Sequence, residues 1–69
     1  MTFHVHDRVT TPNGSGTFQG YTDQTHIQVT ILRANWKPDE RYPAGTYPGK
    51  FTSASPTING VYEIGEVEK

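Results

Sequence analysis

Basic and aromatic side chains alternate in residues 33–50, and no other stretch of the chain is as well suited to binding. The segment carries four basic residues against two acidic ones, a local charge of +2. Aromatic rings can stack on nucleic-acid bases while Arg and Lys hold phosphates, and the same residue types dominate protein–protein hot spots. The alternative is structural, with rings that cap a small core and solvated cations. The candidate binding residues are Arg33, Trp36, Lys37, Arg41, Tyr42 and Tyr47.

The stretch from Ala34 to Gly49 is expected to be a long loop. Its three prolines and two glycines exclude a regular helix, although one short helical turn fits around residues 38–41. A loop of this length in a small domain is more often functional than a plain connection. Its aromatic content argues against disorder, so we expect the loop to be packed at least in part.

Three histidines offer a second kind of chemistry. His4 and His6 would share one face of a strand, and His26 could join them from a neighbouring strand. Three imidazoles can hold zinc, but no further ligand pattern accompanies them, so exposed histidines are the favoured interpretation. The chain has no cysteine, which excludes disulfides and thiolate metal sites. We expect no metal and no cofactor.

Catalytic motifs are missing from the sequence. Serines and threonines are frequent, but none lies in a nucleophile-elbow motif. Residues 13–16, Asn-Gly-Ser-Gly, are similar to a phosphate-binding loop but lack its Gly-Lys-Ser/Thr ending. The glutamates at positions 63, 66 and 68 do not form a convincing acid–base pair. We therefore expect a protein that is not an enzyme.

Residues 5–21 predict the β-hairpin around which the rest of the chain is organised. Thr11 to Gly16 reads as a tight turn, because Pro fixes its own φ and Asn and Gly tolerate positive φ. A bulge at Ser15-Gly16 would be compatible with this turn. Phe18 then returns to the core side, and Gly20 indicates a strand bend or a close backbone approach.

This hairpin resembles the first hairpin of small SH3-like barrels, including the KOW type. In that pattern a Gly-Asp-x-Val strand is followed by a Gly-containing turn and a Gly-x-Val strand. The resemblance covers about a quarter of the chain, with His6 in place of the usual Gly and a Phe where Val is common. It implies a small barrel and admits nucleic-acid binding. The matching positions are Asp7, Val9, Gly14, Gly16 and Phe18.

A more remote resemblance is to the plasmid-type (type II) dihydrofolate reductases, which are short SH3-like chains that work as oligomers. Asp7-Arg8-Val9 and Gly20-Tyr21 are similar to their Asp-Arg-Val strand and Gly-Trp-Tyr step. Their active pore depends on a Val-Gln-Ile-Tyr segment, which this chain lacks. His26-Ile27-Gln28-Val29 is no substitute, so this enzyme remains a remote alternative.

The remaining strands are expected at His26–Arg33, Lys50–Ala54 and Val61–Val67. The first alternates β-branched and polar residues, and Asn59-Gly60 is the strongest two-residue hairpin signal. The sequence therefore predicts an all-β fold, a small five-stranded SH3-like barrel with a long loop between strands 3 and 4. Its expected inward residues are Phe3, Val5, Val9, Phe18, Ile27, Val29, Ile31, Phe51, Val61 and Ile64.

Length and composition limit the classes of protein that fit. The 69 residues allow a single domain, residues 1–69, and with 32% hydrophobic residues the core is small enough that self-association would help. Met1 and the short length predict a stand-alone gene product, of the kind that phages and mobile elements carry. No stretch approaches a membrane span or a signal peptide, and we expect a cytoplasmic location.

The partner is expected to be a protein or a second copy of the chain. The formal net charge is -1, whereas proteins that bind nucleic acid by electrostatics usually carry more positive charge. The sequence therefore predicts a non-enzymatic interaction module that uses the aromatic and basic loop. Nucleic acid is the alternative partner, favoured by the KOW-like hairpin, and no membrane partner is expected.

Overall fold

A computed structural model describes residues 2–40, 43 and 56–69 of the chain. Within them lies one four-stranded antiparallel sheet in the order β1-β2-β3-β4. The strands are β1 (Arg8–Thr11), β2 (Gly14–Tyr21), β3 (His26–Leu32) and β4 (Thr57–Glu63). Two 3-10 helices, η1 (Arg33–Asn35) and η2 (Ile64–Glu66), follow β3 and β4. The all-β prediction is confirmed, and none of the described helices is long and apolar enough to cross a membrane.

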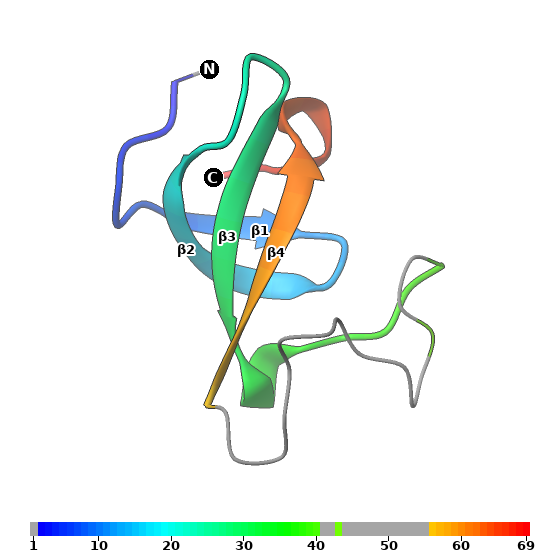
Figure 1. Ribbon diagram of the computed structural model, residues 1–69. Helices are drawn as coiled ribbons and strands as arrows, with labels where there is room; N and C mark the ends of the chain where they lie inside the picture. The colour runs from blue at the N-terminus through cyan, green and yellow to red at the C-terminus, as the bar shows by residue number, and fades with distance from the viewer. Residues whose placement is uncertain (1, 41–42, 44–55) are drawn as a thin grey trace.

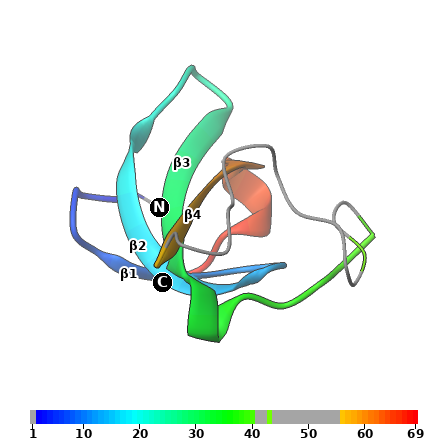
Figure 2. The same ribbon diagram turned by 60° about the horizontal axis from the view of Figure 1, so that its bottom comes forward.

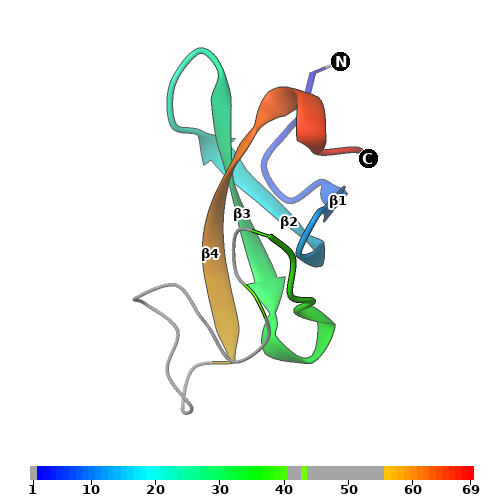
Figure 3. The same ribbon diagram turned by 90° about the vertical axis from the view of Figure 1, so that its right-hand side faces the viewer.

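The sheet is strongly bent (Figure 1). β2 curves so that the β1–β2 hairpin runs across the β3–β4 pair. From another side, the segment after β4 turns back toward β1 (Figure 3). There Thr10 and Glu68 form an isolated antiparallel bridge, with the Thr10 N–H donating to the Glu68 carbonyl at 2.6 Å. The described sheet has four strands and is not closed, and the expected strand at residues 50–54 lies outside the described residues.

The first hairpin turns where the sequence predicts. Thr11 pairs with Gly14, so the turn consists of Pro12 and Asn13 alone. The expected bulge at Ser15-Gly16 is wrong, because both residues pair in regular register with β1. The register shift lies farther along, between Phe18 and Gly20 where β2 pairs with β3. It coincides with the bend of β2 expected at Gly20, whose φ is 151°.

The chain before β1 is a turn rather than the predicted strand. The Asp7 N–H donates to the His4 carbonyl at 2.9 Å, and His6 between them has a φ of 78°. The turn breaks the alternation that placed Val5 in the core, and Val5 is 54% exposed. Of the described residues 2–7, only Phe3 is buried. A positive φ of this kind is adopted more readily by glycine than by histidine.

β4 also departs from the prediction, because Asn59-Gly60 lies in the middle of the strand rather than in a hairpin turn. Asn59 pairs with Thr30 and Gly60 with Val29. The Thr30 hydroxyl donates to the Asn59 side chain at 2.7 Å. A Cβ on Gly60 would lie 2.6 Å from the Tyr62 ring, so the glycine leaves room for that ring. Long-range pairing therefore overrides the local turn signal.

The core lies on the concave side of the bent sheet. Six predicted core residues are buried there, namely Phe3, Val9, Phe18, Ile27, Val29 and Ile31. Ile64 is partly buried against the cluster, Phe51 lies outside the described residues, and Val61 is 51% exposed, contrary to prediction. Gly60 and Tyr62, on either side of Val61 in β4, are buried. Because side chains alternate between the two faces of a strand, Val61 faces solvent. Among the described residues, three buried hydrophobic ones were not predicted as core, namely Ile58, Tyr62 and Val67.

Candidate functional site

Three of the six predicted binding residues lie in the described part of the chain, and they are close together in sequence at the end of β3. Arg33 begins η1 and is exposed. Trp36 is partly buried and packs against the hydrophobic core, and Lys37 is exposed. The predicted helical turn at residues 38–41 is replaced, as far as the described residues reach, by η1 at Arg33–Asn35. Arg41, Tyr42 and Tyr47 lie outside the described residues.

Asn13, in the hairpin turn, holds this segment in place. Its carbonyl accepts the Lys37 N–H at 2.7 Å, and its side-chain amide donates to the Lys37 carbonyl at 2.9 Å. The Tyr62 hydroxyl donates to the other side-chain atom, Oδ1 of Asn13, at 2.7 Å. Asn13 is completely buried. A polar side chain can be buried in this way because each of its hydrogen-bonding groups has a partner.

The hairpin turn is itself fixed from within. The Thr11 hydroxyl accepts the Asn13 N–H at 3.1 Å and donates to the Gly14 carbonyl at 2.8 Å. Gly14 has a φ of 119°, and a Cβ there would overlap the carbonyl oxygen of Asn35 in η1. Glycine is therefore required both by the backbone conformation and by the close approach of η1. Figure 2 shows η1 at the end of β3, beside the β1–β2 hairpin.

These contacts leave a groove between the hairpin and the segment that follows β3. We call it the hairpin groove. Its volume is about 530 Å³, within the range of ligand sites, and Lys37 is the only charged residue among those described that line it. The lining thus combines hydroxyl-bearing residues with a tryptophan and one lysine. The lining residues are Thr10, Thr11, Pro12, Gly14, Ser15, Ala34, Asn35, Trp36 and Lys37.

A second hollow lies beside the hairpin groove and shares Pro12 with it. Of its described lining residues, Asp39, Glu40 and Glu66 carry carboxylates, and Pro12 is the fourth. We call this the acidic pocket. The exposed proline at the hairpin tip therefore separates a positively charged surface from a negatively charged one.

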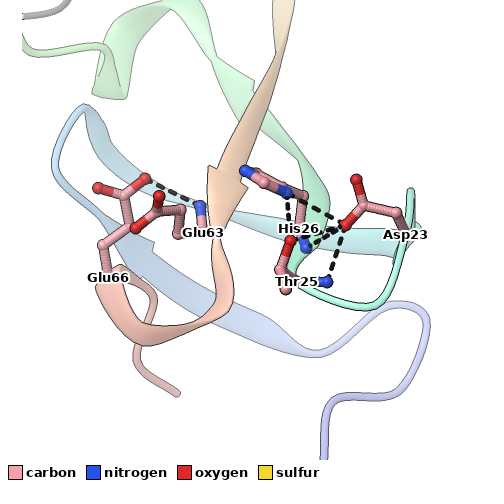
Figure 4. A network of polar contacts seen from close by, with 5 residues as sticks. All are labelled: Asp23, Thr25, His26, Glu63 and Glu66. Atoms are coloured by element: carbon pink, nitrogen blue, oxygen red, sulfur yellow. Dashed lines mark hydrogen bonds and ion pairs between the residues drawn. The ribbon is translucent and has the colours of Figure 1, made fainter.

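A polar network occupies the opposite end of β3 (Figure 4). One carboxylate oxygen of Asp23 accepts the N–H groups of Thr25 and His26, both at 2.8 Å, and lies 3.1 Å from the His26 Nδ1. The Thr25 N–H and then the His26 ring lower the pKa of Asp23 to about 2. Across from it, the Glu63 N–H donates to the Glu66 carboxylate at 2.9 Å. These bonds order a turn and the start of η2, as polar caps do.

The histidines are dispersed rather than gathered. His4 and His6 lie in the turn before β1, and His26 bonds with Asp23. Across the described ranges, no group of three or more His, Cys, Asp or Glu residues could hold a metal ion. Asp7 serves the turn before β1, with its carboxylate accepting the His4 N–H at 2.9 Å. That bond, together with Lys69 at 3.1 Å, holds the pKa of Asp7 below its usual value.

Sequence reasoning missed the part that the hairpin turn has in this site. The sequence indicates only that Asn13 tolerates a left-handed backbone and that Tyr62 belongs to a strand. Nothing local in the sequence pairs position 13 with positions 37 and 62, because the three meet only when the sheet is assembled. Comparisons of the chain with family models, with curated proteins and with solved structures found no match.

Proposed function

We propose that this protein is a small non-enzymatic interaction module that binds a protein partner or a second copy of itself. The binding surface is the hairpin groove, which Trp36 and Lys37 line, together with the nearby Arg33. The observation that carries the proposal is the way Asn13 joins Lys37 to the buried Tyr62. A surface segment held by a buried polar side chain is ordered before any partner arrives, which lowers the entropic cost of binding.

The fold that we propose for the whole chain is a five-stranded SH3-like barrel. Two observations support it. The four strands follow one another as antiparallel neighbours, and the Thr10–Glu68 bridge returns the end of the chain to the first strand. A fifth strand at this bridge would give β1 a neighbour on each side, as closure requires.

A protein partner is favoured over nucleic acid by the charges around the groove. The acidic pocket adjoins it through Pro12, and nucleic acid lying along the hairpin tip would meet those carboxylates. The whole chain carries a formal charge of -1, which gives no general attraction to phosphates.

Nucleic-acid binding remains the second candidate. The observation in its favour is the hairpin groove itself, which Trp36 and Lys37 both line with no described carboxylate in the lining. Stacking of a base on Trp36 with a phosphate on Lys37 would use both groups.

An amide NMR experiment separates these candidates. The uniformly ¹⁵N-labelled protein is first diluted alone, then titrated with mixed-sequence single- and double-stranded oligonucleotides at low and moderate salt. Shifts of the Trp36 indole and the Lys37 amide on dilution indicate self-association through the groove. Shifts with oligonucleotide that fade with salt indicate nucleic acid.

Two outcomes have different consequences for the proposal. Shifts confined to the far end of β3, around Asp23 and Glu63, would place the binding surface elsewhere and contradict it. If the groove resonances stay unchanged under both conditions, the remaining candidate is a different protein. That candidate is tested by comparing the wild type with Lys37→Glu against each isolated partner, and equal binding by the two would refute the groove as the site.

A further inference from the structure

The hairpin groove and the acidic pocket adjoin each other at the hairpin tip. Lys37 lines the hairpin groove, Asp39 and Glu40 line the acidic pocket, and Pro12 belongs to both. A lysine and a group of carboxylates therefore line adjoining hollows on either side of Pro12. A surface of this kind is complementary to itself after a rotation of 180° about an axis between its halves.

Building on the proposed function, we propose that the partner is a second copy of this chain, bound across a two-fold axis beside Pro12. In this dimer Lys37 of each copy faces Glu40 and the acidic pocket of the other. The contact is isologous, so every pairing occurs twice. Pro12 and Trp36 supply the apolar centre, and the charges form the rim.

The spacing of the charges suits such a contact. Residues 36–40 contain no helix, so Lys37 and Glu40 lie at most about 10 Å apart along an extended chain. Two such segments running antiparallel across the axis bring each Lys37 opposite the Glu40 of the other copy. The two pairs then form together, and neither copy has to rearrange.

A second copy can pair with both Lys37 and the carboxylates of the acidic pocket, whereas an anionic partner can pair only with Lys37. An acidic peptide or a nucleic acid would pair with Lys37 and leave its remaining charges against the acidic pocket. Like charges brought together oppose association, and this selects against wrong partners. Ion pairs at an exposed rim contribute little each, so the dimer is expected to be weak and to dissociate in high salt.

Sedimentation velocity on the full chain, from micromolar to millimolar concentration at low and high salt, tests the proposal. The variants are Lys37→Glu, Glu40→Lys and an equimolar mixture of the two. In the mixture every facing pair is again of opposite charge, so the heterodimer should form although neither variant pairs with itself. Arg8→Glu is the matched control, because it makes the same charge change at an exposed position on β1, outside both linings.

The expected result is a wild-type average mass that rises with concentration and falls with salt. Each single variant should stay monomeric, the mixture should recover the wild-type behaviour, and Arg8→Glu should dimerise normally. Circular dichroism checks that all variants are folded. A wild type that is monomeric at millimolar concentration, or a mixture no heavier than its components, overturns the two-fold dimer.

These outcomes distinguish the dimer from the proposed function on which it rests. If the chain is monomeric but Trp36 and Lys37 respond to a different protein, the dimer is wrong and the groove is still the binding surface. If both single variants dimerise as strongly as the wild type, association uses another face, and that result counts against the groove as well.

Discussion

Replacing Tyr62 by Phe tests whether the core holds the binding segment in place. The change removes one hydroxyl from a residue that is 1% exposed and breaks its 2.7 Å bond to Asn13. The Asn13 oxygen is then buried without this donor. A buried group left without its partner costs about 1–3 kcal/mol, so we expect unfolding free energy to fall by about 1–2 kcal/mol.

Urea denaturation followed by circular dichroism measures this effect. The midpoint should fall while the m-value stays the same, because the surface exposed on unfolding is unchanged. In a domain of this size the same loss lowers the melting temperature by roughly 4–8 °C per kcal/mol. Tyr21→Phe is the matched control, since its hydroxyl accepts the Phe3 N–H at 3.1 Å but its side chain is 48% exposed.

A local measurement separates loss of positioning from loss of stability. The Lys37 amide donates to the Asn13 carbonyl, so its hydrogen exchange should accelerate in Tyr62→Phe by more than that of the β3 amides. A double-mutant cycle with Asn13→Ala should show coupling of about 1 kcal/mol. If Tyr62→Phe is as stable as the control and the Lys37 amide is equally protected, the hydroxyl does not position the segment and the reasoning is refuted.

Three further predictions concern other local features of the fold. His6→Gly should raise unfolding free energy by up to about 1 kcal/mol, since glycine relieves a left-handed conformation that is unfavourable for other residues; an unchanged urea midpoint would contradict this. Gly14→Ala should lower the midpoint more than Gly20→Ala does, because both have positive φ but only Gly14 faces an overlapping carbonyl; equal losses would count against that close approach. The Asp23 carboxyl should titrate near pH 2 by ¹³C NMR, and closer to its ordinary value in His26→Ala. Because its pKa is lowered on folding, its contribution to stability is present above about pH 4 and is lost as the pH falls toward 2.

The parts of the fold that the sequence predicted well are those fixed by neighbouring residues. β3 alternates apolar and polar side chains at Ile27, Val29 and Ile31, and those three are buried. The first hairpin turns at Pro12-Asn13, where two adjacent residues favour the turn without help from elsewhere. Both features depend on short-range geometry, which a single sequence carries.

The errors arise where distant segments decide the conformation. Asn59-Gly60 is a strong turn signal, yet pairing with β3 and the space needed by Tyr62 keep it extended. Val5 fits the alternation of a strand, but the turn at His6 exposes it. The extended Asn59-Gly60 depends on pairing with a distant strand. The turn at His6 is held by local bonds between His4 and Asp7 and also by the His6 N–H, which donates to the Phe18 carbonyl of β2 at 3.0 Å.

The sequence indicates one wall of the candidate site but not the other. The basic and aromatic residue types single out residues 33–50, and of these Trp36 and Lys37 line the hairpin groove. What the sequence could not supply was the opposite wall, formed by the hairpin tip, or the buried amide of Asn13 that joins the two walls. A site between two segments needs the fold before its second half can be recognised.

The Thr10–Glu68 bridge has a consequence for how the protein is made. Its two residues are far apart in the sequence, so the outer edge of β1 lacks this partner until the segment around Glu68 has left the ribosome. An uncovered strand edge is a template for pairing with other chains. A chain in which this bridge has not yet formed presents the edge of β1 to the Glu68 segment of any released copy nearby, so we expect exchange of this segment between copies to compete with correct folding.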